Sequence, residues 1–234
     1  MKIGAILFFR MNSKRLPGKS LMKLGEETLL EIIYRKSLLI KGINDIVVAT
    51  SSNYCDDEIA DKCNELKIKV YRGSLDDVAK RGLNCALNYE MDYFMRVCGD
   101  RPFMDAKLAS EQVNFCYNMQ YDLITNCFPK TYPSGMDSEI ISTKTLENNI
   151  QFFNGKEHNE HLTSYFYANY KNFKILNLES SEAHSFVNEN LSIDTMEDYK
   201  KMTFLKNYLE INKIKNSSIA KKIEILNKYK ININ

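Results

Sequence analysis

Apolar residues in this chain alternate between short uninterrupted runs and stripes with helical spacing. The run from Ile3 to Phe9 has the length and composition of a strand that is buried on both faces of a parallel sheet. Stripes such as Ile59, Cys63 and Leu66 predict amphipathic helices. The whole pattern predicts strands over 3–9, 45–50, 67–71, 93–98, 122–127, 138–141 and 173–178.

Helices are predicted between the early strands, and polar residues that can cap them stand at several starts. The predicted helices are 26–40, one capped by Asp56 or Asp57, one from a capping box of Ser74 and Asp77 through Tyr89, and 106–118. Up to residue 127 strands and helices alternate, which is typical of a mostly parallel sheet with right-handed crossovers. We therefore expect an α/β fold that forms one domain over residues 1–234.

Residues 128–170 break this alternation. Pro129, Pro133 and Gly135 mark a loop, and 146–170 is predicted to be largely helical. The segment is too short to bury a core of its own, so we interpret it as an insertion in the domain.

Two further helices are predicted after the insertion. Asp194 is expected to open the first, with Glu197 at the reciprocal capping position. Ile219, Ile223 and Leu226 predict an amphipathic closing helix within 213–230.

The composition is that of an ordinary globular protein, and it argues against nucleic-acid-binding and membrane-spanning functions. The 234 residues are 44% hydrophobic and 26% charged, and the net charge of +2 is too small to indicate a nucleic-acid partner. The lysines near the C-terminus have only Tyr229 as an interleaved aromatic residue, so a solvated helix face explains them better than a nucleic-acid patch does. The N-terminal apolar run is too short to span a membrane, and no small-residue cleavage site follows it.

Cysteine and histidine usage argues against disulfides and against zinc. The six cysteines include no C-x-x-C pair and predict reduced core thiols and a cytoplasmic location. The three histidines do not pair with cysteines at zinc-ligand spacing. His158 and His161 have no third ligand nearby, so we expect them to hydrogen-bond a polar substrate or an interface rather than a metal.

The loop after the first strand carries Arg10, Ser13, Lys14, Arg15 and Lys19, a set that can bind an anion. It would emerge at the carboxyl end of the strand, where open α/β sheets bind their ligands. It lacks the G-x-x-x-x-G-K-[ST] spacing, so Arg15, Lys19 and backbone N–H groups would have to hold phosphate. We hypothesise a nucleoside triphosphate; a solvated surface loop is the alternative on the residues alone.

Other candidate residues have simple structural explanations as well. Asp100 directly follows a predicted buried strand, where a carboxylate can hold Mg²⁺ together with substrate phosphates, and a turn residue is an equal alternative. Helix capping explains Asp194 and Asp77 better than ligand binding does. Arg72 and Arg81 flank the helix after Asp77 and fit surface positions.

Taken together, several motifs resemble those of the CMP-sugar synthetases, the cytidylyltransferases that act on acylneuraminates and 3-deoxy-octulosonates. Residues 10–19 resemble the signature R-x-x-S-x-R-L-P-G-K, and the match is closer to the SpsF-like branch of spore coat polysaccharide biosynthesis. Over roughly residues 1–200 the other motifs follow in order: Val48-Ala-Thr50, Tyr71-Arg-Gly-Ser74 with Asp77, Val78 and Arg81, Val97-Cys-Gly-Asp-Arg-Pro102, Tyr132-Pro-Ser-Gly135 with Glu139, Glu160-His-Leu-Thr163, and Ile193-Asp-Thr195 with Glu197 and Asp198.

This resemblance implies a three-layer α/β/α fold of the nucleotide-diphospho-sugar transferase type, CTP as substrate, Mg²⁺ as cofactor and a homodimer. It implies catalytic roles for Arg15, Lys19 and Asp100, and it makes Asp100 and Asp194 the metal ligands. The nucleotide-binding residues that the resemblance implies are Phe9, Arg10, Met11, Asn12, Ser13, Arg15, Lys19, Thr50, Arg72, Ser74 and Asp77.

For the acceptor, the resemblance implies an acidic keto-sugar for surface glycan biosynthesis, whose oxygen attacks the α-phosphorus of CTP and releases pyrophosphate. The insertion is expected to bind the acceptor and to form the dimer contact. The acceptor candidates are Arg101, Tyr132, Glu139, Glu160 and His161, of which Arg101 departs from the small or acidic residue usual after the motif aspartate. A phosphorylated or phosphonate acceptor is the enzyme alternative. A nucleotide-binding regulatory protein without turnover is the alternative from another class, and no nucleic-acid or membrane partner is expected.

Overall fold

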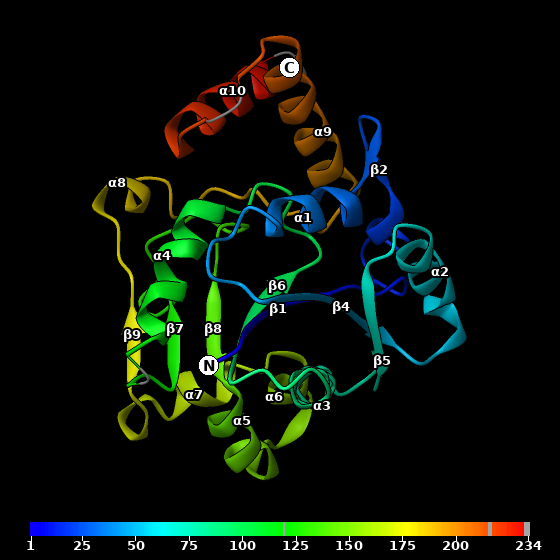
Figure 1. Cartoon of the computed structure of the whole chain (residues 1–234). Coiled ribbons are helices and arrows are strands. Elements are labelled where there is room, and N and C mark those ends of the chain that lie inside the picture. Colours follow the sequence, from blue (N-terminus) through cyan, green and yellow to red (C-terminus); the bar gives the residue numbers. More distant parts are fainter. Residues whose placement is uncertain (119, 215–216, 232–234) are drawn as a thin grey trace.

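The computed structural model describes residues 1–118, 120–214 and 217–231, and a seven-stranded sheet forms its centre (Figure 1). The strands in spatial order are β5 (Lys69–Gly73), β4 (Asp45–Ser51), β1 (Ile3–Phe8), β6 (Tyr93–Cys98), β8 (Glu139–Ser142), β7 (Leu123–Thr125) and β9 (Ile175–Asn177). The first four are parallel, β8 is antiparallel to both neighbours, and β7 is parallel to β9. The predicted mostly parallel sheet is confirmed.

Helices cover both faces of the sheet and complete a three-layer arrangement (Figure 1). Strand residues alternate between two cores, so that Leu7 and Val48 lie in one and Ile6 and Val47 in the other. The first core is closed by α1 (Leu29–Ser37), α2 (Asp57–Glu65), α4 (Ala106–Cys116), α9 (Met196–Ile211) and α10 (Ile219–Ile231), and the second by α3 (Val78–Asn88), α5 (Thr143–Asn149) and α7 (Ser164–Ala168).

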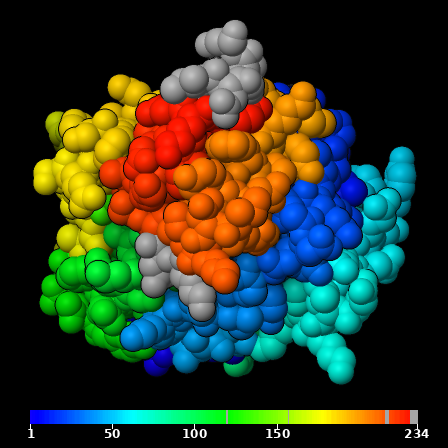
Figure 2. All heavy atoms as spheres, turned by 90° about the horizontal axis from the view of Figure 1, so that it is seen from above, coloured from blue at the N-terminus to red at the C-terminus, as the bar shows by residue number. Residues whose placement is uncertain are grey.

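The C-terminal helices form an outer layer of their own. Seen from above, α9 and α10 cover one face of the molecule (Figure 2). The predicted amphipathic face of the closing helix is confirmed, because Ile223 and Leu226 are buried. The helix starts only at Ile219, and residues 215 and 216 of the predicted span lie outside the described residues. No helix in the described part of the chain is long and apolar enough to cross a membrane.

The first predicted helix, 26–40, is wrong in extent. Residues 23–28 form a hairpin of β2 (Lys23–Leu24) and β3 (Glu27–Thr28), because Gly25 turns the chain at φ +69°. A capping box of Thr28 and Glu31 then starts α1. The insertion is largely helical over 146–170 as predicted, and it contains α5, a 3₁₀ turn, α6 (Gly155–Glu160) and α7. The remaining short helix, α8 (Ser181–His184), precedes α9.

Capping also differs from the predictions at α2 and α3. The side chain of Asp56 makes no capping bond at α2, because it is buried and accepts bonds from other backbone groups. Asp77 caps α3 by accepting from the N–H of Lys80, whereas Ser74 lies one turn earlier.

The predicted cap of α9 is shifted by one residue. Thr195 and Asp198 form the capping box, in place of Asp194 and Glu197. The carboxylate of Asp198 accepts from the N–H groups of both Asp194 and Thr195. The carboxylate of Asp194 is therefore directed to other partners, and helix capping does not explain this residue.

Candidate active site

The candidate site lies where the strand order of the sheet reverses. The chain passes from β1 to β4 and β5 on one side, and then returns to β6 on the other side of β1. Such a switch point opens a crevice at the carboxyl ends of the strands. A cavity of about 430 Å³ occupies this position, lined by the loops after β1 and β6, by the end of α6 and by Asp194.

The loop after β1 has a defined shape, because its backbone is bound at several points. Gly18, at φ +74°, closes a turn in which its N–H donates to the carbonyl of Met11 over 2.8 Å. The N–H of Met11 donates to the buried carboxylate of Asp56 over 2.7 Å, and the hydroxyl of Ser20 donates to the carbonyl of Arg10 over 2.8 Å. The loop thus holds its cationic side chains on a fixed backbone.

The loop after β6 approaches this first loop closely at Gly99. The N–H of Gly99 donates to the carbonyl of Phe8 over 3.0 Å. A Cβ at this position would lie 2.5 Å from the ring of Phe9 and 2.6 Å from the Phe8 oxygen, so only glycine fits without a shift. This close approach brings Asp100 to the edge of the first loop.

Three segments of the chain meet at the ammonium of Lys19. Its Nζ lies 3.1 Å from Oδ2 of Asp100, 3.2 Å from Oδ1 of Asp194 and 2.7 Å from the carbonyl oxygen of Ile193. Arg15 contacts the same oxygen of Asp194 at 2.9 Å. The side chain of Lys19 is 12% exposed and that of Arg15 is 66% exposed. Lys19 therefore forms the floor of the cluster and Arg15 its rim.

Asp100 is held in its ionised form by two neighbouring cations. Burial raises its pKa, but Lys19 and Arg101 outweigh this effect, and the pKa of Asp100 lies below its usual value. Arg101 is itself anchored, since its guanidinium lies 3.2 Å from the carboxylate of Asp137 and donates to the carbonyl of the same residue. A carboxylate beside fixed cations is thus available at neutral pH.

The insertion closes the cavity from the opposite side. Glu160, at the end of α6, pairs with Arg10 of the first loop at 2.7 Å, and His161 follows it in the lining. The hydrogen bond from Arg10 lowers the pKa of Glu160. The predicted acceptor segment and the predicted nucleotide loop are therefore in contact.

Arg81 lines the cavity from α3 and is almost fully buried, at 2% exposure. Its Nη1 donates to the carbonyl of Ser74 over 2.8 Å and its guanidinium lies over the ring of Phe8, whereas Nε has no partner among the described residues. Burial lowers its pKa to about 10. The predicted surface position is wrong, and a buried cation that lines the cavity is suited to an anionic ligand.

A buried ion pair supports the wall near β6. Arg96 lines the cavity and pairs with Glu139 at 2.7 Å, and the hydroxyl of Tyr167 donates to the other carboxylate oxygen over 2.7 Å. Burial opposes the charge of Glu139, but Arg96 and Arg101 keep its pKa below the usual value. Glu139 is 4% exposed, so it contacts Arg96 and not the cavity.

The structure brings ten of the predicted site residues into one lining and leaves eight outside it. The lining contains Phe9, Arg10, Ser13, Arg15, Lys19, Asp100, Arg101, Glu160, His161 and Asp194. Outside the lining that the described residues form lie Met11, Asn12, Thr50, Arg72, Ser74, Asp77, Tyr132 and Glu139.

Residues outside the lining have structural partners that define their position. Arg72 donates to the carbonyls of Ser51 and Asn53 and pairs with Asp57, so it ties β5 to the loop after β4. Thr50 is fully buried in β4, and Tyr132 packs against the hydrophobic core.

The lining also contains residues that sequence reasoning missed. Arg96 had a recognisable signal, because it is the one charged residue within the apolar run of β6. Val78, Cys98 and Gly99 stand within the recognised motifs without a predicted site role, whereas Phe8 and Ser20 carry no local signal of a site.

The charges of the lining suit a polyanion that arrives with a divalent cation. Positive side chains outnumber the acidic ones, which are Asp100, Glu160 and Asp194. Asp100 and Asp194 converge on one cation, Lys19, and Mg²⁺ prefers such carboxylate oxygens together with substrate phosphates. No cluster of three or more potential metal-ligating side chains occurs among the described residues. The donor set therefore fits Mg²⁺ with the remaining ligands supplied by substrate and water.

Comparison with known proteins identifies relatives along the whole chain. A family model described as Cytidylyltransferase matches residues 5–232. An uncharacterised protein of Methanocaldococcus jannaschii is 34% identical over 97% of this chain and 91% of its own length. The spore coat polysaccharide biosynthesis protein SpsF of Bacillus subtilis is 29% identical over 95% of this chain and 93% of its own. A 3-deoxy-manno-octulosonate cytidylyltransferase of Flavobacterium johnsoniae is 31% identical over 45% of this chain and 43% of its own.

Solved structures share the fold. A cytidylyltransferase from Leptospira borgpetersenii superposes with a TM-score of 0.85 and 29% identity, covering 99% of this chain and 95% of its own. A CMP:2-keto-3-deoxy-manno-octonic acid synthetase complexed with CTP superposes with a TM-score of 0.69 and 14% identity, covering 89% of this chain and 99% of its own. The predicted three-layer fold is confirmed.

Proposed function

This chain belongs to the cytidylyltransferase family of CTP-dependent nucleotidyltransferases, and we propose that it transfers CMP from CTP to an acidic keto-sugar with release of pyrophosphate. The observation that carries the proposal is the cluster of Lys19, Asp100 and Asp194 in the cavity. A nucleoside triphosphate requires cations for its phosphates and carboxylates for its metal ion, and this cluster supplies both.

Arg10, Ser13, Arg15 and Lys19 are the proposed ligands of the triphosphate. The acceptor oxygen forms a bond to the α-phosphorus while the bond to the bridging oxygen breaks, and the hydroxyl proton leaves to solvent. Pyrophosphate departs with the negative charge, which Arg15 and Lys19 stabilise. Such a transfer depends on positioning and charge neutralisation more than on covalent help from the protein.

Asp100 and Asp194 would hold Mg²⁺, which when bound neutralises phosphate charge. Lys19 and Arg101 keep the carboxylate of Asp100 ionised for this role. Lys19 balances the charges of the two carboxylates and would also stabilise the leaving pyrophosphate.

The cytidine is proposed to lie between the first loop and the start of α3. Phe9, Met11 and Asn12 would contact it from the loop. The segment from β4 to α3 contributes Thr50, Arg72, Ser74 and Asp77, of which Arg72 acts by fixing the loop after β4. Arg81, whose Nη1 is bound to the carbonyl of Ser74, would contribute its positive charge on this side of the cavity.

An acidic keto-sugar acceptor is supported by relatives whose names specify 3-deoxy-manno-octulosonate or its synonym as their substrate. A carboxylate on the acceptor would meet Arg96 and Arg101 at the cavity wall, with Glu160 and His161 facing it from the insertion. Glu139 would act through Arg96, and Tyr132 through the packing of the insertion.

The insertion over 128–170 is further proposed to form the contact of a homodimer within a single-domain subunit. Phe128, Phe152 and Tyr170 of this segment leave large parts of their rings exposed, which an interface would cover. A cytoplasmic location agrees with the six free cysteines.

Mass analysis of the products from an acceptor panel tests the proposal. The chain is incubated with CTP and MgCl₂ and with 3-deoxy-manno-octulosonate, an acylneuraminate, a sugar phosphate or an alkyl phosphonate, and pyrophosphate is measured. We expect a CMP-sugar from a keto-sugar acid, and Asp100→Asn as the control should release no pyrophosphate. A CDP-linked product formed only from a phosphorylated acceptor would refute the proposed acceptor.

A further inference from the structure

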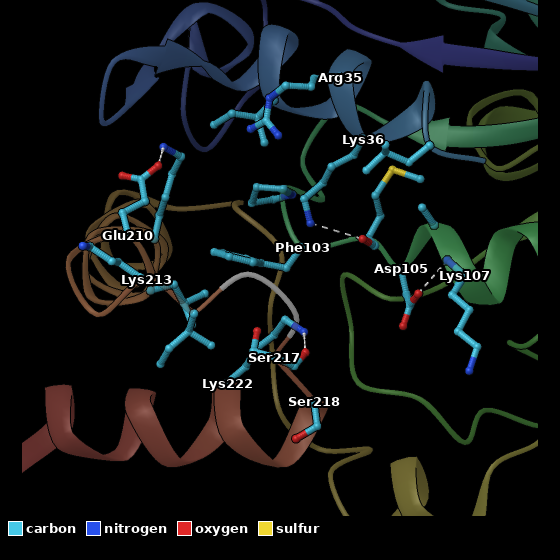
Figure 3. A pocket seen from close by; sticks show the side chains of 18 residues that line it. Arg35, Lys36, Phe103, Asp105, Lys107, Glu210, Lys213, Ser217, Ser218 and Lys222 are labelled. Carbon is cyan, nitrogen blue, oxygen red and sulfur yellow. Dashed lines mark hydrogen bonds and ion pairs between the residues drawn. The ribbon is translucent and has the colours of Figure 1, made fainter. Parts of the chain in front are cut away.

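A second cavity, of about 1,040 Å³, adjoins the loop that follows Asp100 (Figure 3). Its walls are α1, residues 102–107, α9 and the start of α10, and it shares no lining residue with the active-site cavity. The cavity is thus a separate feature of the fold, built between α1, the loop after Asp100 and the C-terminal segment.

The lining of this second cavity carries an excess of positive charge. Its acids are Asp105 and Glu210, and its cations are Arg35, Lys36, Lys107, Lys206, Lys213 and Lys222. Lys206 pairs with Glu210, and Arg35 pairs with Glu27 from outside the cavity. Asp105 uses its carboxylate to cap α4. The acids therefore leave several of the cations unbalanced.

Lys36 and Lys222 are cations without an ion pair among the described residues, and their side chains reach the inside of the cavity. The Nζ of Lys36 donates to the carbonyl of Met104 over 3.3 Å, and that of Lys222, a residue 9% exposed, donates to the carbonyl of Ser217. Neither ammonium forms an ion pair with a carboxylate in the part of the chain that the structure describes. Figure 3 shows the two side chains entering from opposite walls, Lys36 from α1 and Lys222 from α10.

Burial of these two charges is costly without a counter-ion. Lysines that merely cover apolar surface extend their ammonium groups into water, whereas these two turn inward to neutral carbonyl groups. Burial lowers the pKa of Lys36 to about 8, with a contribution from the charge of Lys222, and burial also lowers the pKa of Lys222. The carboxylate of Asp105 opposes both shifts but does not outweigh burial. The attraction of an anion bound between the two lysines would offset the desolvation cost of their charges and screen their mutual repulsion.

The same cavity offers an apolar wall beside these lysines. The ring of Phe103 lies 5.5 Å from the Nζ of Lys36, and Ile32, Leu209 and Ile214 complete this side. A ligand that fills the space must therefore combine a charged end with an apolar part. The volume is at the upper end of the range for small-molecule sites.

We propose that this cavity binds a small organic anion with an apolar body, of the alkyl phosphate class. Its anionic head lies between Lys36 and Lys222 and its body packs against Phe103. The site is independent of the proposed transfer reaction, because none of its residues lines the active-site cavity.

Calorimetric titration with n-octyl phosphate below its micellar concentration tests this proposal. The full chain should bind it, whereas n-octyl glucoside, which is neutral, should bind at least tenfold more weakly. Lys36→Gln and Lys222→Gln should each weaken octyl phosphate binding by about tenfold or more, since each removes one charge-assisted bond. The matched control is Lys221→Gln, because Lys221 is adjacent on α10 but pairs with Glu224 and lies outside the lining. Asp100→Asn should bind octyl phosphate as the wild type does, which separates this site from the active site.

A protection experiment on the wild-type chain covers the case in which a variant does not fold. Limited acetylation with and without octyl phosphate is followed by peptide mass analysis. The ligand should slow modification of Lys36 and Lys222 and leave Lys221 unchanged. Absence of binding, equal affinity for the glucoside, or equal protection of all three lysines would overturn the proposal.

Discussion

The ammonium of Lys19 lies 3.1 Å from a carboxylate oxygen of Asp100, which joins the loop after β1 to the loop after β6. The same ammonium contacts Asp194, so a residue that precedes α9 completes the cluster. The phosphate-binding residues and the metal-binding residues proposed for this enzyme are therefore one electrostatic unit. A substitution at any of the three positions should therefore change the electrostatic environment of the other two.

Replacement of Lys19 by methionine should weaken CTP binding by about 10- to 100-fold. The substitution removes a charge-assisted bond, which is typically worth about 1.5–3 kcal/mol. Calorimetric titration with CTP measures the effect, and Lys23→Met is the control because Lys23 is exposed on the neighbouring hairpin. Equal CTP affinity of Lys19→Met and the wild type would remove Lys19 from the site.

Replacement of Glu139 by glutamine should destabilise the fold by about 3–5 kcal/mol. The change leaves Arg96 buried without its counter-charge, which is the costly way to break a buried ion pair. Urea unfolding gives the value, with the exposed Glu147→Gln as the control. The double variant Arg96→Met with Glu139→Gln should recover part of the loss; a double variant as unstable as the sum of the single changes would contradict this assignment.

Replacement of Gly99 by alanine should cost about 1–3 kcal/mol of stability, because the added Cβ would overlap the Phe9 ring and the Phe8 carbonyl. The loop that carries Asp100 must then move away from the first loop, so CTP affinity should fall as well. Thermal unfolding and CTP titration on the same samples measure both effects. A stable variant with full CTP affinity would show that the close approach is not needed.

Replacement of Lys36 by methionine should change stability in a pH-dependent way. The folded-state pKa of Lys36 is lowered to about 8 from its usual value of 10.5, so between these values the unfolded chain binds the proton more than the folded chain does. Wild-type stability should therefore rise relative to Lys36→Met as the pH increases from 8 to about 10.5. Urea unfolding at pH 7 and pH 9.5 compares the two chains, and a constant difference would contradict the lowered pKa.

The strands of the sheet were predicted well, because a buried parallel strand is an apolar run that can be recognised without knowing which strands it pairs with. The run Tyr93–Cys98 was predicted with the bounds that the structure has. Helix starts were less reliable, since several polar residues compete for each cap. At α9, for example, Thr195 is the N-cap residue, and the carboxylate of Asp194 contacts Lys19 in the site.

The candidate site could be predicted only where motif residues are adjacent in sequence. The first loop and Asp100 belong to such motifs. The burial of Arg81, the ion pair between Arg96 and Glu139, and the contact between Arg10 and Glu160 depend on the packing of distant segments. No short sequence motif predicts these contacts.

The central claim, that Asp100 and Asp194 bind the metal of a CTP complex, is tested most directly by calorimetric titration of CTP with MgCl₂ and with EDTA. The wild type should bind CTP at least tenfold more tightly with MgCl₂. Asp100→Asn and Asp194→Asn should lose this difference while still binding CTP through the first loop. Variants that keep the full Mg²⁺ effect would contradict the account.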